Sequence, residues 1–144
     1  MLQIRAARPA DVGLLRGLDP LAAPGTDRHR DIGLWVERGD CYVAQRDGTV
    51  AGYLVMASFL HRPFIELVVV DELHRRRGIA SALVGYARDL TPAAELWTST
   101  NRSNMPMRAL LSKLGFALSG RVDNLDPGDP ELFFVHQPPR TSPG

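Results

Sequence analysis

The feature that most constrains the fold is an apolar segment followed closely by a basic loop that contains one glycine. Residues 64–70, with the sequence Phe-Ile-Glu-Leu-Val-Val-Val, are nearly all apolar, which is typical of a strand buried on both faces. Apolar residues then recur at helical spacing from Ile79 to Leu90. Between the two lies Arg75-Arg76-Arg77-Gly78. The sequence therefore predicts a buried strand, a tight loop and an amphipathic helix in direct succession.

The rest of the chain predicts one domain at residues 1–137 and a disordered C-terminal tail at residues 138–144. Further strands are predicted at residues 2–6, 41–46, 50–59, 95–100, 116–122 and 131–136, and further helices at 8–18, 29–38 and 104–114. Asp47-Gly48 is typical of a hairpin turn, whereas Arg62-Pro63 is expected to interrupt the chain before the buried strand. This order favours an α/β fold in which a central mixed sheet has helices on both faces.

Composition narrows the classes of partner. The 144 residues carry 17 basic and 16 acidic side chains, a formal net charge of +1, whereas a nucleic-acid-binding protein usually carries a larger basic excess. The single cysteine, Cys41, excludes an internal disulfide and is typical of a reducing compartment. The first residues lack the plan of a signal peptide, and no long apolar run could span a membrane. These features predict a cytoplasmic protein with neither a membrane nor a nucleic acid as partner.

The basic loop has the chemistry of a phosphate-binding site. Backbone N–H groups at the start of a helix have no partner within the helix, and the helix dipole adds positive potential there. Gly78 and the small Ala80 would let a diphosphate approach the backbone, and the arginines would add charge at the rim. The loop has neither the Lys-Ser/Thr of a Walker loop nor the further glycines of a dinucleotide fingerprint. Taken alone, it is equally typical of a solvated basic turn or a nucleic-acid-binding patch.

A second segment supports the phosphate-binding interpretation. The pattern Arg-x-x-Gly-x-Ala after a buried strand resembles the pyrophosphate-binding motif of the GNAT superfamily of N-acetyltransferases. The next landmark of that family is a strand that ends in an Asn-x-x-Asn loop, followed by a helix that closes with Gly-Phe. Here Asn101 and Asn104 frame such a loop, and Gly115-Phe116 closes the next helix. The resemblance covers nearly the whole chain and implies a single-domain, mostly antiparallel GNAT fold of bacterial type.

The resemblance implies acetyl-CoA as co-substrate and assigns residues to it. The backbone of the buried strand at Val68 and Val70 would bond the pantetheine arm. Backbone amides would hold the pyrophosphate at Arg75, Arg76, Arg77, Gly78, Ala80 and Ser81. Asn104 would bond the cofactor near its thiol end, with Asn101 lining the same gap, although both asparagines are also typical of turn formation and helix capping.

Direct attack of an amine on the thioester, which the resemblance also implies, needs a proton acceptor, donors for the oxyanion and a proton donor for the thiolate. Glu66 is the best candidate base, because it is the one charge in the apolar strand and burial would favour its protonated form. The alternative is a structural glutamate that is ion-paired or faces outward. Leu111 stands where the family usually has a tyrosine as proton donor, and the neighbouring Ser112 points about 100° away around the helix.

The sequence does not distinguish between small amines, amino acids, antibiotics and protein N-termini as the acceptor. It also does not decide whether the protein forms a homodimer. A non-catalytic acyl-CoA-binding module is the alternative that Leu111 favours. The acidic residues Asp123, Asp126, Asp129 and Glu131 are typical of a solvated turn, and would favour a cationic acceptor if they faced it. The four histidines are too widely spaced for a metal site, and Cys41 is typical of a small core residue.

Overall fold

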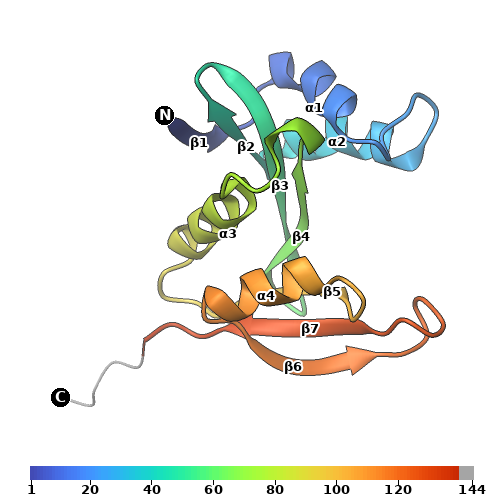
Figure 1. Cartoon of the computed structure of the whole chain (residues 1–144), viewed down its shortest axis with the longest axis vertical. Helices are drawn as coiled ribbons and strands as arrows, with labels where there is room; N and C mark the ends of the chain where they lie inside the picture. Colours follow the sequence, from blue (N-terminus) through green and yellow to red (C-terminus); the bar gives the residue numbers. More distant parts are fainter. Residues whose placement is uncertain (140–144) are drawn as a thin grey trace.

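Seven strands form one sheet in the order β1-β2-β3-β4-β5-β7-β6 in the structure, a computed structural model that describes residues 1–139 (Figure 1). The strands are β1 Leu2–Ala6, β2 Cys41–Arg46, β3 Thr49–Phe59, β4 Arg62–Val70, β5 Leu96–Asn101, β6 Ala117–Val122 and β7 Glu131–His136. Among these strands, β4 and β5 pair in parallel and all other neighbours are antiparallel. The predicted mixed, mostly antiparallel sheet is confirmed.

Helices cover both faces of the sheet, as predicted (Figure 1). The α-helices are α1 Val12–Leu18, α2 Asp27–Arg38, α3 Ile79–Leu90 and α4 Met105–Lys113, and one-turn 3-10 helices lie at Pro9–Asp11 and Glu72–His74. Leu15 of α1 and Ile32 of α2 pack with Tyr53 in the core on one face. Leu83 of α3 and Leu111 of α4 belong to the core on the other face. No helix within the described residues is long and apolar enough to span a membrane.

The connection between β3 and β4 differs from the prediction. The sequence predicts an interruption at Arg62-Pro63, but β4 already begins at Arg62 and Pro63 pairs with Ser58 of β3. The turn lies earlier, at Leu60 and His61, whose φ angles are positive at 51° and 66°. A proline is tolerated in a strand at a position where no neighbouring strand needs its N–H as a donor. Pro63 meets this condition on the side of β5, because the pairing of β4 with β5 begins only at Phe64.

The limit of the domain at residue 137 stays a prediction. Pro138 and Pro139 have no regular secondary structure, and residues 140–144 of the predicted tail lie outside the described residues.

Gly85 in the middle of α3 gives a stability prediction. A Cβ added there would meet no heavy atom within 4 Å, so Gly85→Ala adds helix propensity without a clash. We expect the free energy of unfolding to rise by about 0.4–1 kcal/mol, measured by denaturant unfolding. The control is Gly52→Ala on β3, whose Cβ would lie 2.7 Å from the carbonyl oxygen of Val69 and should destabilise the protein. A loss of stability in Gly85→Ala would contradict the prediction.

Candidate active site

The centre of the sheet is a fork between the two parallel strands. β4 and β5 pair at Phe64–Trp97 and Ile65–Thr98 and have no further paired positions, so the two strands part after Ile65. The Thr98 hydroxyl donates a buried hydrogen bond of 3.0 Å to the carbonyl oxygen of Ile65 and fixes the point of parting. From Glu66 to Val70, the edge of β4 that faces β5 therefore lacks a strand partner.

A small cavity of about 150 Å³ lies in this fork. Its walls come from β4, β5, α3 and α4, and are formed by Ile65, Glu66, Leu67, Val68, Val84, Thr98, Ser99, Thr100, Asn104, Met107 and Leu111. A cavity of this size suits a small group of a few atoms and not a whole cofactor.

Glu66 lines the fork but is exposed, so the predicted burial of its carboxylate is wrong. The register of β4 against β3 shifts between Val55 and Met56, which pair with Leu67 and Ile65, and leaves Glu66 as the extra residue of a bulge. A bulged residue leaves the alternation of the strand and can point into a site next to it. Within residues 1–139, the carboxylate has no hydrogen bond or ion pair that would engage it.

The loop after β4 presents a row of free backbone donors. The N–H groups of Arg76, Arg77, Gly78, Ile79, Ala80 and Ser81 have no backbone acceptor among the described residues, and the first bond of α3 runs from the Ala82 N–H to the Gly78 oxygen at 3.0 Å. The φ angles of Arg76 and Gly78 are positive, at 66° and 76°. Such alternation turns successive N–H groups toward one side and makes an anion-binding concavity. A positive φ at a residue such as Arg76 raises the free energy of the folded state by about 1–3 kcal/mol, and such strained backbone is typical of ligand-binding sites.

A groove of about 430 Å³ lies along this loop and continues past the start of α4. The predicted pyrophosphate residues Arg75, Arg76, Gly78, Ala80 and Ser81 line it together with Val70. Arg77 does not line it. Pro106 and Leu110 of α4 form its other wall, while Met107 and Leu111 of the same helix line the fork cavity. The groove and the fork therefore follow one another along β4 and α4.

The two asparagines lie on different sides of the fork. Asn104 lines the fork cavity and also caps α4, because its Oδ1 accepts a 3.3 Å hydrogen bond from the Met107 N–H. Asn101 lines neither the cavity nor the groove. Its Nδ2 donates to Oδ2 of Asp126 at 2.9 Å and to the carbonyl oxygen of Asp129 at 3.1 Å. Asn101 thus holds the β6–β7 connection against the end of β5.

Glu131 is a site residue that the sequence analysis treats as part of a solvated turn. It lies half-buried on β7, and its Oε2 accepts a 3.1 Å hydrogen bond from the hydroxyl of Ser99, which lines the fork. Burial raises the pKa of Glu131, and the nearby Asp126 and Asp129 carboxylates raise it further against the opposing effect of the Ser99 hydrogen bond. The sequence alone does not reveal that Glu131 is linked to the cavity through Ser99, because this contact depends on the pairing of β5 with β7.

Leu111 stands at the fork as the sequence predicts, fully buried at 1% exposure and unable to donate a proton. Cys41 is no substitute as a reactive group. It is 1% exposed in the core, and burial raises the pKa of its thiol to about 12. Within residues 1–139 no three His, Cys, Asp or Glu side chains are grouped so that they could hold a metal ion.

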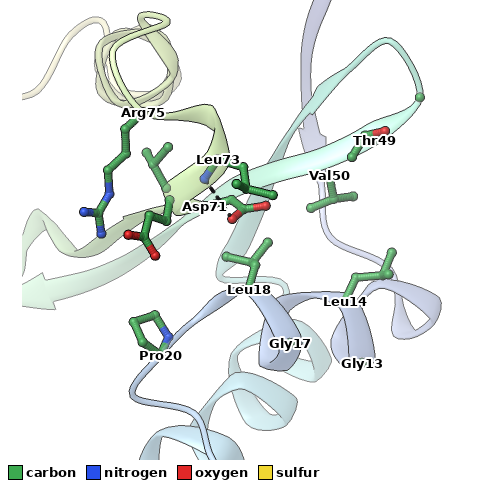
Figure 2. Close-up of a pocket in the computed structure, with 13 residues that line it drawn as sticks. Gly13, Leu14, Gly17, Leu18, Pro20, Thr49, Val50, Asp71, Leu73 and Arg75 are labelled. Atoms are coloured by element: carbon green, nitrogen blue, oxygen red, sulfur yellow. Dashed lines mark hydrogen bonds between the residues drawn. The ribbon is translucent and has the colours of Figure 1, made fainter.

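A larger cavity, of about 820 Å³, lies between α1, the β2–β3 turn and the segment after β4 (Figure 2). Its walls are mainly apolar, with Leu14, Leu18, Val50 and Leu73 pointing into it. Asp71 and Glu72 are the acids that line it, and Oδ1 of Asp71 accepts a 3.3 Å hydrogen bond from the Leu73 N–H. Size alone does not make it the active site, since it combines neither free backbone donors nor a strand fork.

Comparison with known proteins gives one family. The model of the acetyltransferase (GNAT) family matches residues 16–116. The structure of a GNAT-family acetyltransferase from Bacillus cereus is 30% identical, with a TM-score of 0.86 over 97% of this chain and 99% of that chain. The ribosomal-protein-S18-alanine N-acetyltransferase of Escherichia coli is 19% identical, with a TM-score of 0.81 over 99% of this chain and 97% of that one.

Nourseothricin acetyltransferase is 21% identical, with a TM-score of 0.74 over 96% of this chain and 99% of that one. At such identities the last two comparisons show a shared fold and nothing about the acceptor of this chain. A comparison with curated proteins finds no match.

Proposed function

The chain belongs to the acetyltransferase (GNAT) family and is an acyltransferase, and on this premise we propose that it moves an acetyl group from acetyl-CoA to a primary amine by direct attack. The observation that carries the proposal is the continuity of the free N–H groups at Arg76 to Ser81 with the fork beside Glu66. The donors suit the pyrophosphate, and the fork suits the thioester. Both lie along β4, as one extended substrate requires.

Each predicted residue has a part in this proposal. The unpaired edge of β4 at Val68 and Val70 bonds the pantetheine arm, and an N–H of that edge meets the developing oxyanion. Amides from Arg76 to Ser81 hold the pyrophosphate. The Arg75 N–H donates to the carbonyl oxygen of Glu72 at 3.4 Å, so Arg75 contributes its guanidinium, and Arg77 adds charge from outside the groove. Asn104, whose Oδ1 is engaged in its cap, offers its amide N–H groups to the cofactor. Asn101 acts from the opposite side by fixing the β6–β7 connection.

The acceptor in this proposal is a cationic amine. Glu66, Glu131, Asp126 and Asp129 place carboxylates at or beside the fork, and the structure gives no basic partner to Glu131 within residues 1–139. An acidic entrance raises the local concentration of ammonium ions and suits an amine that loses its proton at Glu66. We place the activity in the cytoplasm, and the free, buried Cys41 supports a reducing compartment. A homodimer stays a prediction.

A non-catalytic acyl-CoA-binding module is the second candidate, because Leu111 occupies the wall of the fork where the family usually has its proton donor. Both candidates bind acetyl-CoA. Release of free CoA thiol in the presence of a panel of primary amines separates them, because only an enzyme consumes the thioester. The absence of amine-dependent thiol release from a protein that binds acetyl-CoA would favour the binding module.

Acetyl-CoA should raise the melting temperature, because a ligand that binds only the folded state stabilises it by mass action, by about 2.7 kcal/mol at 100 times its Kd. We expect Gly78→Val to abolish this rise, since its side chain would occupy the approach to the free N–H groups. Differential scanning fluorimetry with and without acetyl-CoA measures both effects. The smaller Gly78→Ala gives a second reading if the valine variant is unstable.

Gly39→Val is the matched control. Gly39 has φ of 78° and ψ of 19°, against 76° and 14° for Gly78, so both valines suffer the same backbone strain. Gly39 lies at the end of α2, away from the groove, and its variant should keep the full ligand-induced rise. An equal rise in Gly78→Val and Gly39→Val would refute the proposed pyrophosphate site.

A further inference from the structure

Thr100 is a polar side chain that the fold leaves without a partner in the fork cavity. It is only 7% exposed and lines the cavity, and its hydroxyl makes no hydrogen bond to any described residue. Thr100 pairs with Leu132, which belongs to the core under α3 and α4, so its side chain lies on the same face of the sheet as Leu111. The only fully buried side-chain polar atoms without a partner in residues 1–139 are His74 Nδ1 and Trp97 Nε1, so the Thr100 hydroxyl is open to the cavity. An accessible hydroxyl that no protein group engages can donate to a ligand that enters the cavity.

The other hydroxyls of the cavity are already engaged. Thr98 donates to the carbonyl oxygen of Ile65, and Ser99 donates to Glu131. Asn104 also lines the cavity, but its Oδ1 already accepts the hydrogen bond that caps α4. Within residues 1–139, Thr100 is therefore the hydroxyl in the wall of the fork cavity that no protein group engages.

We propose that Thr100 donates a hydrogen bond to the thioester sulfur and stabilises the departing thiolate, the task left open by Leu111. This inference rests on the proposed function, because it needs the thioester of acetyl-CoA in the fork. Thr100 does not belong to the motifs that define the resemblance, and the sequence pattern assigns it no role beyond ending a strand.

The reaction then balances without an acid at residue 111. The amine lone pair forms the C–N bond, the carbonyl electrons move to oxygen and return, and the C–S bond breaks with its electron pair on sulfur. The amine proton passes to the Glu66 carboxylate and later reaches the thiolate or solvent. Thr100 keeps its own proton, because an alcohol holds it more tightly than a thiol, whose ordinary pKa is about 8.5.

The test uses CoA itself, so it does not depend on the identity of the acceptor. The Kd of CoA is measured by calorimetry for wild type, Thr100→Val and Thr100→Ser at about pH 6.5 and about pH 10, on either side of the ordinary thiol pKa. Thr100→Val should bind CoA about 10- to 100-fold more weakly at the higher pH, since a hydrogen bond to a charged group is lost, and nearly normally at the lower one. Thr100→Ser should restore the affinity.

Desulfo-CoA, which lacks the sulfur, is the control ligand. The ionisable groups that line or adjoin the cavity are Glu66 of β4 and Glu131 behind Ser99, whereas α3 and α4 contribute only the apolar Val84, Met107 and Leu111 and the neutral Asn104. A change in the charge of Glu66 or Glu131 should affect the binding of CoA and of desulfo-CoA equally. The Kd of desulfo-CoA should therefore be the same for wild type and Thr100→Val at each pH.

Thr98→Val is the matched variant on the same strand. It removes the hydrogen bond to Ile65 and should lower the melting temperature, whereas Thr100→Val removes a hydroxyl without a partner and should leave it unchanged or higher. Equal CoA affinity of wild type and Thr100→Val at both pH values would overturn the role of Thr100 alone. A wild type that binds neither CoA nor acetyl-CoA would overturn the proposed function as well.

Discussion

Glu66→Gln is expected to lower acetyl transfer by roughly 10²–10⁴-fold, the range that a general base contributes, while leaving the affinity for acetyl-CoA nearly unchanged. Glutamine keeps the size and the hydrogen-bonding capacity of the side chain but cannot accept the amine proton. The measurement is the steady-state rate of thiol release with the best amine of the panel, together with the Kd of acetyl-CoA. Because Glu66 is exposed and unengaged within the described residues, the melting temperature should not change.

The pH–rate profile adds a second readout. The wild-type rate should rise with pH as the base loses its proton, and Glu66→Gln should lack this acidic limb. The wild type should also lack an alkaline limb from a tyrosine near its usual pKa of about 10, because Leu111 cannot supply it.

Glu37→Gln on α2 changes an exposed glutamate far from the fork and should keep full activity. Glu131→Gln distinguishes the Glu66 carboxylate, which lines the fork, from the Glu131 carboxylate behind Ser99. It should raise KM for a cationic amine while retaining the acidic limb of the profile. Full activity of Glu66→Gln at every pH, with the acidic limb lost in Glu131→Gln instead, would assign the base to Glu131.

The local pattern of the chain predicts most of the elements but not their contacts across the sheet. The apolar run before Arg75 and the glycine at residue 78 predict the strand, the loop and the helix where the structure has them. The order of strands and helices is confirmed from Leu2 to His136. The segment from β4 to α3 and the order of the elements can both be predicted, because apolar periodicity and turn residues are local features of the sequence.

The bulge at Glu66 is different, because it depends on the pairing of β4 with β3 and not on the residues of β4 alone. An alternating pattern buries every second residue of a strand, whereas a bulge moves one residue out of the alternation. The sequence therefore identifies Glu66 as the unusual charge of the strand but predicts the wrong environment for it.

The roles of Asn101, Glu131 and Thr100 are hidden for the same reason. Asn101 meets Asp126 and Asp129 across 25 and 28 residues, and Ser99 meets Glu131 across 32 residues. Only the adjacency of β5 and β7 brings these groups together. Whether the Thr100 hydroxyl has a hydrogen-bond partner depends on the residues that the fold places around it, and the local sequence does not predict those residues.

Asp19→Ala is expected to cause a large loss of stability. Asp19 is 4% exposed at the end of α1, and it accepts hydrogen bonds from the Tyr53 hydroxyl, from Arg28 at 2.9 Å and from the Leu21 N–H at 2.9 Å. The variant leaves a buried hydroxyl and a largely buried cation without a partner. Breaking such a pair costs 3–5 kcal/mol, and we expect about 3 kcal/mol because Arg28 is 23% exposed and can regain water.

The pH dependence of stability should change when Asp19 is replaced by asparagine, which cannot ionise. Burial alone would raise the pKa of Asp19, but its hydrogen bonds from Tyr53, Leu21 and Arg28 outweigh burial and hold that pKa below its usual value. A lowered folded-state pKa contributes stability that is present above the unfolded pKa and is lost as the pH falls through the folded one. The wild type should therefore lose stability below about pH 4, and Asp19→Asn should lose less over the same range. Some loss should remain, because Arg5 also lowers the pKa of Asp11.

Asp27→Ala provides the matched control. Asp27 lies at the start of α2 and pairs with Arg30 at 3.3 Å, but its side chain is 87% exposed, so its removal should cost less than about 1 kcal/mol. Urea unfolding of both variants gives the two free energies, and similar losses would contradict a special role for the buried pair. Asp19 supports the α1 and α2 face of the sheet, whereas the free N–H groups begin α3 on the other face. Asp19→Ala should therefore keep the rise in melting temperature that acetyl-CoA produces, although it starts from a lower value.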